Sequence, residues 1–225
     1  MKGLPRIVKP YGIILTQRHL ALFDTYLDEL ERWNKRINLT GITSRRRMLH
    51  ELLVDSLIPS PYVPDHGYGL DLGSGAGFPA IPIKILHPDL VLHLVEVKTK
   101  KVAFLKHATR ILNLDGIQVI HGRIEDLHEE LRDSGYHIVT ARAVSRLSQN
   151  VVWCAPHVRF RGILIGFLGP ERNWEIENKI APVLKGCGLT LERVIPYRLP
   201  GQGHMRNTVI FRKTARPSQN RRLSI

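Results

Sequence analysis

The sequence is poor in cysteine and has no long hydrophobic run. Its 225 residues include two cysteines, Cys154 and Cys187, which lie far apart and form no CxxC pair. We therefore expect neither a disulfide framework nor a zinc knuckle, and place the protein in the reducing cytoplasm. No apolar stretch approaches the roughly 18 residues of a transmembrane helix. The N-terminal charges precede no apolar segment, so we expect no secretory signal.

Metal-ligand patterns are also missing. None of the 11 histidines falls in an HxxxH or HExxH pattern. Such spacings bring two imidazoles to one face of a helix, where they can hold a zinc ion. We therefore expect no metal site.

Acidic residues are scarce. The chain has 33 Lys+Arg against 20 Asp+Glu, a net charge of +13, and residues 32–50 and 206–225 contain basic residues but no acid. Such segments predict a polyanionic partner, because each neutralised phosphate releases condensed counterions. The alternative is a merely basic surface with a disordered tail. Membrane binding is disfavoured because neither segment has a strong apolar face. Nothing indicates an obligate dimer, so we expect a monomer.

Apolar spacing predicts a helical N-terminal region followed by alternating strands and helices. Two helices are expected first, from Thr16, a plausible N-cap, to Ile37 and from Ser44 to about Ile58. Strands that alternate with helices indicate a parallel sheet covered on both faces, and the last two strands, joined by a short link, should form an antiparallel hairpin. The later expected strands are Tyr68–Leu72, Val91–Glu96, Ile117–His121, Tyr136–Ala141, Ile163–Phe167, Thr190–Ile195 and Thr208–Phe211, and the later helices are Phe78–Leu86, Thr99–Leu112, Glu125–Arg132, Leu147–His157 and Glu171–Lys185.

A glycine-rich loop, Asp71-Leu-Gly-Ser-Gly-Ala-Gly-Phe-Pro79, closes the first of these later strands and opens a helix. Glycines allow a tight turn close to a ligand, and the helix offers free N–H groups. The spacing is G-x-G-x-G rather than the dinucleotide fingerprint, because Phe78 stands where that fingerprint has its third glycine. Asp71 would repel a pyrophosphate but can orient polar groups around an aminoacyl moiety. The loop thus favours S-adenosylmethionine (AdoMet), with Gly73 and Gly75 against the ligand.

Two further acids fit the same ligand. Glu96 ends the second strand of this region, where a carboxylate can accept hydrogen bonds from ribose hydroxyls. Glu125 or Asp126, after the third strand, can meet the adenine amino group. We therefore predict a doubly wound, Rossmann-like α/β fold of the AdoMet-dependent methyltransferase class. It has a seven-stranded, mostly parallel sheet in residues 65–213, an N-terminal helical extension (1–64) and a basic flexible tail (214–225).

The chain resembles the bacterial 16S ribosomal RNA guanine-N7 methyltransferases, the glucose-inhibited division protein B family. The resemblance spans roughly residues 16 to 212, and its W-N-x-x-x-N-L-T and G-x-G-x-G-x-P-x-I-P segments together are quite specific. The matching pieces are Trp33-Asn-Lys-Arg-Ile-Asn-Leu-Thr40, Val54-Asp-Ser-Leu57, the glycine loop, Lys100-Lys-Val-Ala-Phe-Leu105, Gly122-Arg-Ile-Glu125 and Ala141-Arg-Ala143.

This resemblance implies methylation at N7 of a guanine in the decoding region of small-subunit RNA. It implies AdoMet contacts at Gly73, Phe78, Ile124, Glu125 and Arg142. The sequence departs from the family at Glu51-Leu52, where members often carry Arg-His, and at Leu168, where many carry Lys.

Absent motifs agree with N7 chemistry. The expected fourth strand of the sheet is not followed by the Asn/Asp-Pro-Pro-aromatic motif of adenine amine methylation, and no Pro-Cys nucleophile is present. Guanine N7 carries a lone pair and no proton, so we expect in-line transfer without a general base, accelerated mainly by positioning. Arg142 is the candidate catalytic residue, either holding the cofactor or donating to guanine O6. Alternatively it forms a structural ion pair with Asp71 or Glu125.

For contacts to RNA we nominate Asn38, Lys100, Lys101, Arg142 and Arg206. Asn38 can instead cap the turn between two helices, and the lysines can form an ordinary solvated helix face. Trp33 is expected in the core rather than as a base-stacking platform.

Three other functions compete with this interpretation: an AdoMet methyltransferase of small molecules or proteins, a non-catalytic RNA-binding assembly protein on the same fold, and a nicotinamide-dependent oxidoreductase. The basic segments disfavour the first, the intact loop and acids disfavour the second, and Phe78 disfavours the third.

Overall fold

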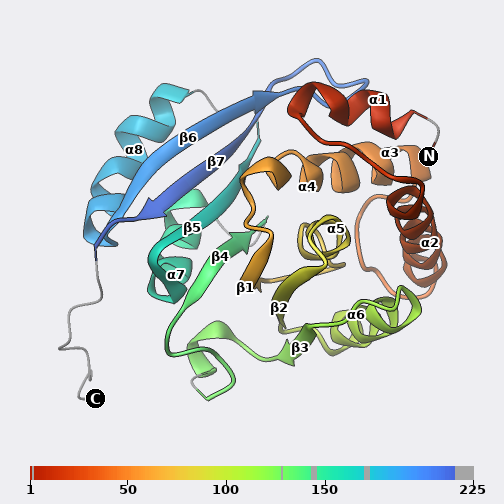
Figure 1. Ribbon diagram of the computed structural model, residues 1–225, viewed down its shortest axis with the longest axis horizontal. Coiled ribbons are helices and arrows are strands. Elements are labelled where there is room, and N and C mark those ends of the chain that lie inside the picture. The colour runs from red at the N-terminus through yellow and green to blue at the C-terminus, as the bar shows by residue number, and fades with distance from the viewer. Residues whose placement is uncertain (2, 128, 143–145, 170–172, 216–225) are drawn as a thin grey trace.

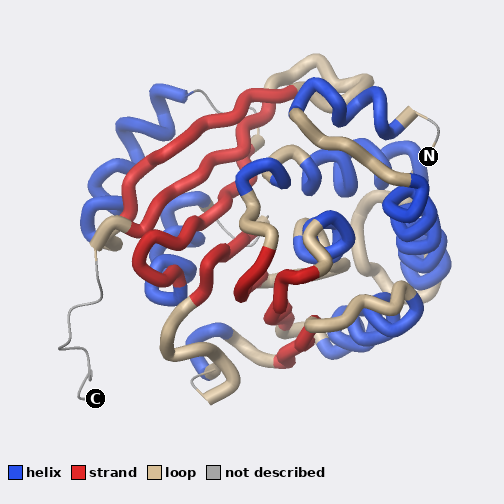
Figure 2. The backbone as a smooth tube through the Cα atoms, viewed as in Figure 1, coloured by secondary structure: helices blue, strands red, loops and turns tan. Residues whose placement is uncertain are grey.

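The computed structural model describes the chain except residues 2, 128, 143–145, 170–172 and 216–225. For residues 173–179 it describes the backbone alone. A twisted seven-stranded sheet runs through the molecule in the order β3-β2-β1-β4-β5-β7-β6 (Figures 1 and 2). The strands are β1 (His66–Leu72), β2 (Asp89–Glu96), β3 (Ile117–His121), β4 (Tyr136–Ala141), β5 (Val158–Leu168), β6 (Leu189–Tyr197) and β7 (Arg206–Lys213).

The sheet is parallel except at β7, which pairs antiparallel with both β5 and β6. The expected seven strands and the C-terminal hairpin are therefore confirmed. The new detail is that β7 inserts between β5 and β6, so that the chain returns to the sheet interior before it ends. The parallel strands β1 to β5 all end at the same edge of the sheet, which is where open α/β sheets bind ligands.

Successive residues of each strand pack alternately into two separate hydrophobic cores, one on each face of the sheet. Leu92, Ile138 and Ile165 face one cluster, whereas Leu72, Val139 and Leu164 face the other, as the period of two in a strand requires. The first cluster is covered by α2 (Gln17–Asn34), α5 (Ala80–Leu86) and α6 (Thr99–Ile111), and the second by α7 (Leu147–Cys154) and α8 (Asn173–Gly186) (Figure 1).

The N-terminal helices belong to the first cluster rather than to a separate core. Phe23, Leu27 and Leu30 of α2 are fully buried together with Leu53 and with Ile81 of α5. The expected N-cap of α2 is confirmed, because the Thr16 hydroxyl accepts a hydrogen bond from the backbone N–H of His19 at 3.2 Å. A short helix that the periodicity did not predict, α1 (Leu4–Val8), adds Leu4 and Val8 to the same core.

The second predicted helix is present but is not a regular α-helix. It comprises α3 (Arg45–Arg47), a π-helical segment (Met48–Val54) and α4 (Asp55–Leu57). A π-helical turn holds an extra residue, so it shifts which side chains face inward and is common at functional sites. Hydrophobic spacing alone does not reveal such a turn.

Two predicted helices need correction. The helix expected at Glu125–Arg132 is only a 3-10 turn (Ile124–Asp126), because Ile124 and Leu127 bury their side chains within a single turn and too few apolar groups follow to stabilise a longer helix. The helix expected from Phe78 begins at Ala80, after Pro79. The expected start of α8 at Glu171 and most of the basic tail lie outside the described residues. None of the described helices is long and apolar enough to cross a membrane.

Candidate active site

A cavity of about 220 Å³ opens where β1 and β4 end. The glycine loop forms its floor, and the N-terminal extension, α6 and the end of β4 supply its walls. Its lining residues are Leu39, Thr40, Leu52, Gly73, Ser74, Gly75, Ala76, Phe78, Lys101 and Arg142. None of these described lining residues is an acid, a histidine or a cysteine.

The loop that forms the floor needs its glycines. Gly73, Gly75 and Gly77 have φ values of 68°, 59° and 90°, a region that side chains with a Cβ rarely adopt. At Gly77 an added Cβ would lie 2.6 Å from the Ile81 side chain and 2.8 Å from the Tyr26 hydroxyl oxygen. The loop therefore packs closely against both α5 and α2, which fixes its path.

Tyr26 fastens the loop from the N-terminal extension. Its hydroxyl donates a hydrogen bond to the carbonyl of Ala76, and its ring lies 5.0 Å from the ring of Phe78. Tyr26 is fully buried, and burial raises its pKa well above the ordinary value, so the hydroxyl remains a donor. This role was not predicted, because in the sequence Tyr26 is one more apolar position of a helix.

Asp71 lies buried beneath the loop. One carboxylate oxygen accepts a hydrogen bond from the Thr140 hydroxyl at 2.6 Å, while Oδ2 has no hydrogen-bond partner among the described residues. Burial raises the pKa of Asp71 to about 6, although the Thr140 bond opposes this shift. An unsatisfied buried acceptor of this kind suits a ligand that brings a polar hydrogen or a positive charge.

Glu96 reaches the loop but is already engaged. Its two carboxylate oxygens accept hydrogen bonds from the backbone N–H groups of Gly75 and Lys98, both at 2.8 Å. It therefore braces the loop against the end of β2. Each oxygen retains a second lone pair, so a ribose hydroxyl can still be accepted.

The remaining expected cofactor residues lie farther along the same edge. The third loop contacts the second strand, because the N–H of Gly122 donates to the carbonyl of Glu96 at 3.2 Å. Ile124 is buried and Glu125 is exposed, and neither lines the cavity. The glycine-loop floor fits an AdoMet molecule, and Asp71 beneath the loop and Glu96 beside it would hold its polar groups, although neither acid lines the cavity itself.

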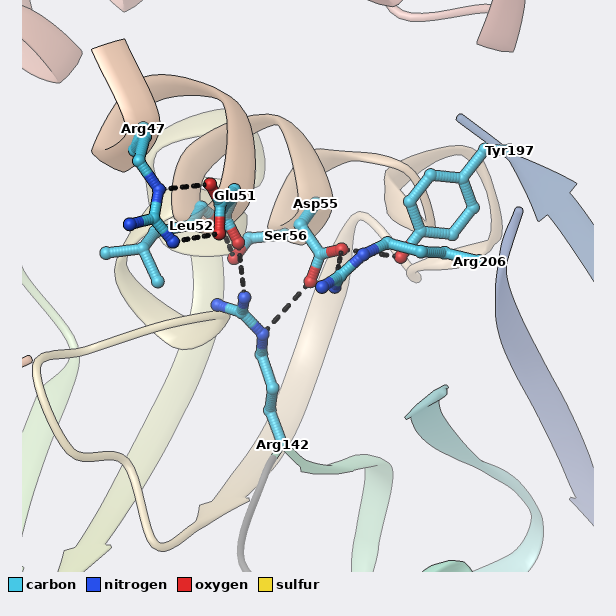
Figure 3. Close-up of polar contacts among 8 residues, drawn as sticks. All are labelled: Arg47, Glu51, Leu52, Asp55, Ser56, Arg142, Tyr197 and Arg206. Carbon is cyan, nitrogen blue, oxygen red and sulfur yellow. Dashed lines mark hydrogen bonds and ion pairs between the residues drawn. The ribbon is translucent and has the colours of Figure 1, made fainter. Parts of the chain in front are cut away.

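Arg142 lies at the cavity and pairs with an acid from an unexpected place. Its Nε lies 3.0 Å from Oδ2 of Asp55, and its Nη2 donates to the backbone carbonyl of Glu51 (Figure 3). The alternative expected from the sequence, an ion pair with Asp71 or Glu125, is thus wrong. The partner comes instead from α4, which tertiary packing brings to the end of β4. The signal in the sequence was a single acid between Val54 and Leu57, on the inward face of an apolar helix.

Asp55 also holds the C-terminal hairpin. The Tyr197 hydroxyl donates to its Oδ1 at 2.6 Å, and Nη1 of Arg206 donates to the same oxygen at 3.0 Å (Figure 3). The guanidinium of Arg206, nominated for RNA, is thus committed to Asp55.

The other nominated RNA residues are distributed around the cavity mouth. Lys101 lines the cavity, with Nζ 3.7 Å from where a Cβ on Gly75 would lie, and Lys100 beside it is exposed. Asn38 is exposed too, and the turn it was expected to cap is held by Asn34, whose Oδ1 accepts from the N–H groups of Leu39 and Thr40, both at 3.0 Å.

Trp33 packs in the core as expected, 5.6 Å from the ring of Phe104.

Part of the first basic segment is neutralised by acids distant in sequence. Arg45 pairs with Asp24, Asp28 and Glu31 of α2 at 2.6, 2.6 and 2.8 Å. Arg47 pairs with Glu51, one of the three residues that depart from the family pattern, and a second, Leu52, forms part of the cavity wall. Lys35, Arg36 and Arg46 remain exposed.

Within the described residues, no group of three or more histidines, cysteines or acids is placed to hold a metal ion.

Comparison with known proteins gives one consistent family. The profile of the GidB family, described as "rRNA small subunit methyltransferase G", matches residues 19–187. The chain is 38% identical over 207 residues to the protein named ribosomal RNA small subunit methyltransferase G of Chloroflexus aggregans, covering 91% of this chain and 86% of that one. It is 34% identical over 206 residues to the protein of the same name in Bacillus subtilis, covering 90% and 85%.

Solved structures resemble the chain in fold. M. jannaschii TYW2 in complex with AdoMet superposes with a TM-score of 0.58 at 14% identity, over 72% of this chain and 75% of that one. A methyltransferase from Pyrococcus furiosus superposes with a TM-score of 0.59 at 11% identity, over 78% and 86%. The fold is accordingly that of the AdoMet-dependent methyltransferases.

Proposed function

This chain belongs to the GidB family of small-subunit rRNA methyltransferases, uses AdoMet as methyl donor, and on that basis we propose that it methylates one guanine of 16S rRNA at N7. We place this activity in the cytoplasm, carried out by a monomer on the small subunit or its RNA. The observation that carries the choice of atom is the cavity lining, which has cationic groups but no general base among its described residues.

The lining decides between methyl acceptors. Bound AdoMet supplies a methyl group on a positively charged sulfur, which an acceptor lone pair displaces in line. An acceptor that must lose a proton calls for a base within hydrogen-bond reach. Guanine N7 has an in-plane lone pair and no proton, so Thr40, Ser74 and Arg142 need only hold the base at the correct angle.

Each residue has a defined task in this proposal. Gly73, Gly75 and Phe78 form the surface on which AdoMet lies. Asp71 and Glu96 hold the polar groups of AdoMet, and Ile124 and Glu125 flank its adenine. Arg142 donates to guanine O6 through the guanidinium nitrogen that has no hydrogen bond to the described residues. Asn38, Lys100 and Lys101 contact the RNA around the cavity mouth, whereas Arg206 acts through Asp55.

The test is direct. The purified protein is incubated with methyl-labelled AdoMet and small subunits, or their RNA, from a strain that lacks the enzyme. N7-methylation labilises the guanine ring, so mild alkali, borohydride and aniline should cleave the labelled RNA at one position. Label that resists this cleavage, or that enters protein, contradicts the assignment to N7. Transfer to free RNA but not to subunits, or the reverse, identifies the physiological form of the substrate.

A further inference from the structure

Asp55 is a fully buried acid with two cationic neighbours. Its relative exposure is 0%, and it has no role among the residues expected to bind cofactor or RNA. Arg142 approaches Oδ2 from the end of β4, and Arg206 approaches Oδ1 from the start of β7 (Figure 3). A buried carboxylate is unfavourable unless it is paired and hydrogen-bonded. Oδ1 accepts hydrogen bonds from Tyr197 and Arg206, whereas Oδ2 has the ion pair with Arg142 and no hydrogen bond among the described residues.

The contacts of Arg142 are divided in a specific way. Nε faces Asp55 and Nη2 bonds to the carbonyl of Glu51, so two sides of the planar guanidinium are fixed by the π-helical segment and by α4. Figure 3 shows the remaining nitrogen pointing away from both anchors. Arg142 lines the cavity, and this third nitrogen has no hydrogen bond to the residues that the structure describes, so it is the part of the guanidinium that a ligand can meet.

Charge gives this arrangement a second consequence. The cavity has to accept the sulfonium cation of AdoMet, while Arg142 and Lys101, both cationic, stand on its wall. Like charges a few ångströms apart repel each other, and the repulsion is stronger where water is excluded. The carboxylate of Asp55, directly behind Arg142, offsets that repulsion while leaving the donor edge of the guanidinium in place.

We propose that Asp55 is a positioning residue that fixes the guanidinium of Arg142 at the cavity and offsets its charge, so that the cavity accepts a sulfonium cation beside an arginine. Tyr197 and Arg206 in turn hold Asp55, which ties the C-terminal hairpin to the cofactor pocket. This inference rests on the proposed function only in placing the methyl donor in this cavity.

The charge term is tested by comparing AdoMet with S-adenosylhomocysteine, whose sulfur is neutral. Both dissociation constants are measured by calorimetry for the wild type and for Asp55→Asn. The substitution retains the side-chain shape but leaves Arg142 uncompensated. We expect the dissociation constant of AdoMet divided by that of S-adenosylhomocysteine to rise about fivefold. A purely structural role weakens both ligands equally and leaves the ratio unchanged, which would overturn the inference.

The matched control is Glu192→Gln. Glu192 is an acid that pairs with an arginine, Arg212, through two hydrogen bonds, but it lies on β6 and does not line the cavity. This variant makes the same chemical change at an Asp/Glu–Arg pair, so the ratio should stay at the wild-type value. A shift as large as that of Asp55→Asn would show that the effect is a general one of net charge and would count against the proposal.

A second pair of variants tests the charge effect in the absence of the Arg142 cation. Arg142→Gln leaves Asp55 with Arg206 as counterion, and its ratio should move in the opposite direction, toward AdoMet. Adding Asp55→Asn to that background should return the ratio to the wild-type value. If the ratio is the same in Arg142→Gln and in the double variant, Asp55 exerts no charge effect on the cavity and the proposal fails.

Methyl transfer gives an independent readout of positioning. At saturating AdoMet we expect Asp55→Asn to lower kcat about 100-fold, with the KM for RNA changed less than threefold, because a displaced Arg142 misorients a base that still binds. Asp55→Glu, which keeps the charge, should recover part of the loss. An unchanged kcat contradicts the inference. A wild-type protein that binds AdoMet but methylates no guanine N7 contradicts the proposed function alone, since the ligand ratios remain measurable.

Discussion

The hydroxyl of Tyr26, near the middle of α2, donates a hydrogen bond to the carbonyl of Ala76, at the centre of the glycine loop. An N-terminal helix is therefore part of the proposed cofactor site rather than an appendage to it. The loop is held from both sides, by Tyr26 from the extension and by Glu96 from the sheet.

Removal of the Tyr26 hydroxyl should loosen the loop. We expect Tyr26→Phe to weaken AdoMet binding about tenfold and to lower the free energy of unfolding by about 1–2 kcal/mol, since a buried carbonyl loses its partner. Calorimetric titration and urea unfolding measure the two effects. Tyr62→Phe, at an exposed tyrosine, is the matched control and should change neither. Equal AdoMet affinities for wild type and Tyr26→Phe would refute a role in shaping the pocket.

Glycine substitutions should differ in severity according to their surroundings. Gly203→Ala meets open space and should change stability by less than about 0.5 kcal/mol. Gly75→Ala carries a φ of 59° and should cost about 1–2 kcal/mol. Gly77→Ala adds contacts at 2.6 and 2.8 Å to an unfavourable φ, and should cost more than either and abolish AdoMet binding. Any other order in urea midpoints would contradict this account of the loop.

Asp71 should make stability depend on pH. Burial raises the pKa of its carboxyl to about 6 from an ordinary 3.8. Between about pH 4 and pH 6 the folded state therefore holds a proton that the unfolded state has lost, so the free energy of unfolding falls as pH rises through that window. Above pH 6 the full loss of stability from the buried carboxylate is present. Relative to wild type, Asp71→Asn should gain about 2–3 kcal/mol between pH 4 and pH 7.

Urea unfolding of both proteins at several pH values provides the measurement. The difference between them removes the contribution of all other titrating groups. Parallel stability curves would show that Asp71 keeps an ordinary pKa.

The salt dependence of RNA binding should separate free lysines from the engaged arginine. Each phosphate contact to single-stranded RNA contributes about 0.7 to the slope of log K against log salt. Lys100→Gln and Lys101→Gln should each reduce the slope by about that amount. Arg206→Gln should leave it unchanged, because the guanidinium of Arg206 is committed to Asp55. A reduced slope for Arg206→Gln, measured by filter binding to small-subunit RNA, would restore Arg206 to the RNA surface.

Local patterns were sufficient to predict the architecture and the floor of the site. The period-two and period-3.6 spacings gave all seven strands and most helices, since each element buries one face regardless of its partners. The loop from Asp71 to Pro79 was recognisable because successive positive-φ positions strongly favour glycine. Glu96 ends β2 as the strand pattern predicted, and its contact with a ribose remains a prediction.

What the sequence could not determine are the contacts between segments far apart in the chain. Asp55 meets Arg142, 87 positions later, and Arg206, 151 positions later, only because α4 packs across the ends of β4 and β7. The contact of Tyr26 with Ala76 depends in the same way on the packing of α2 against the glycine loop. The three ion pairs of Arg45 likewise depend on its position beside α2. Sequence patterns report which side of an element is apolar; the partner of a buried charge depends on how the elements pack, which is a property of the whole fold.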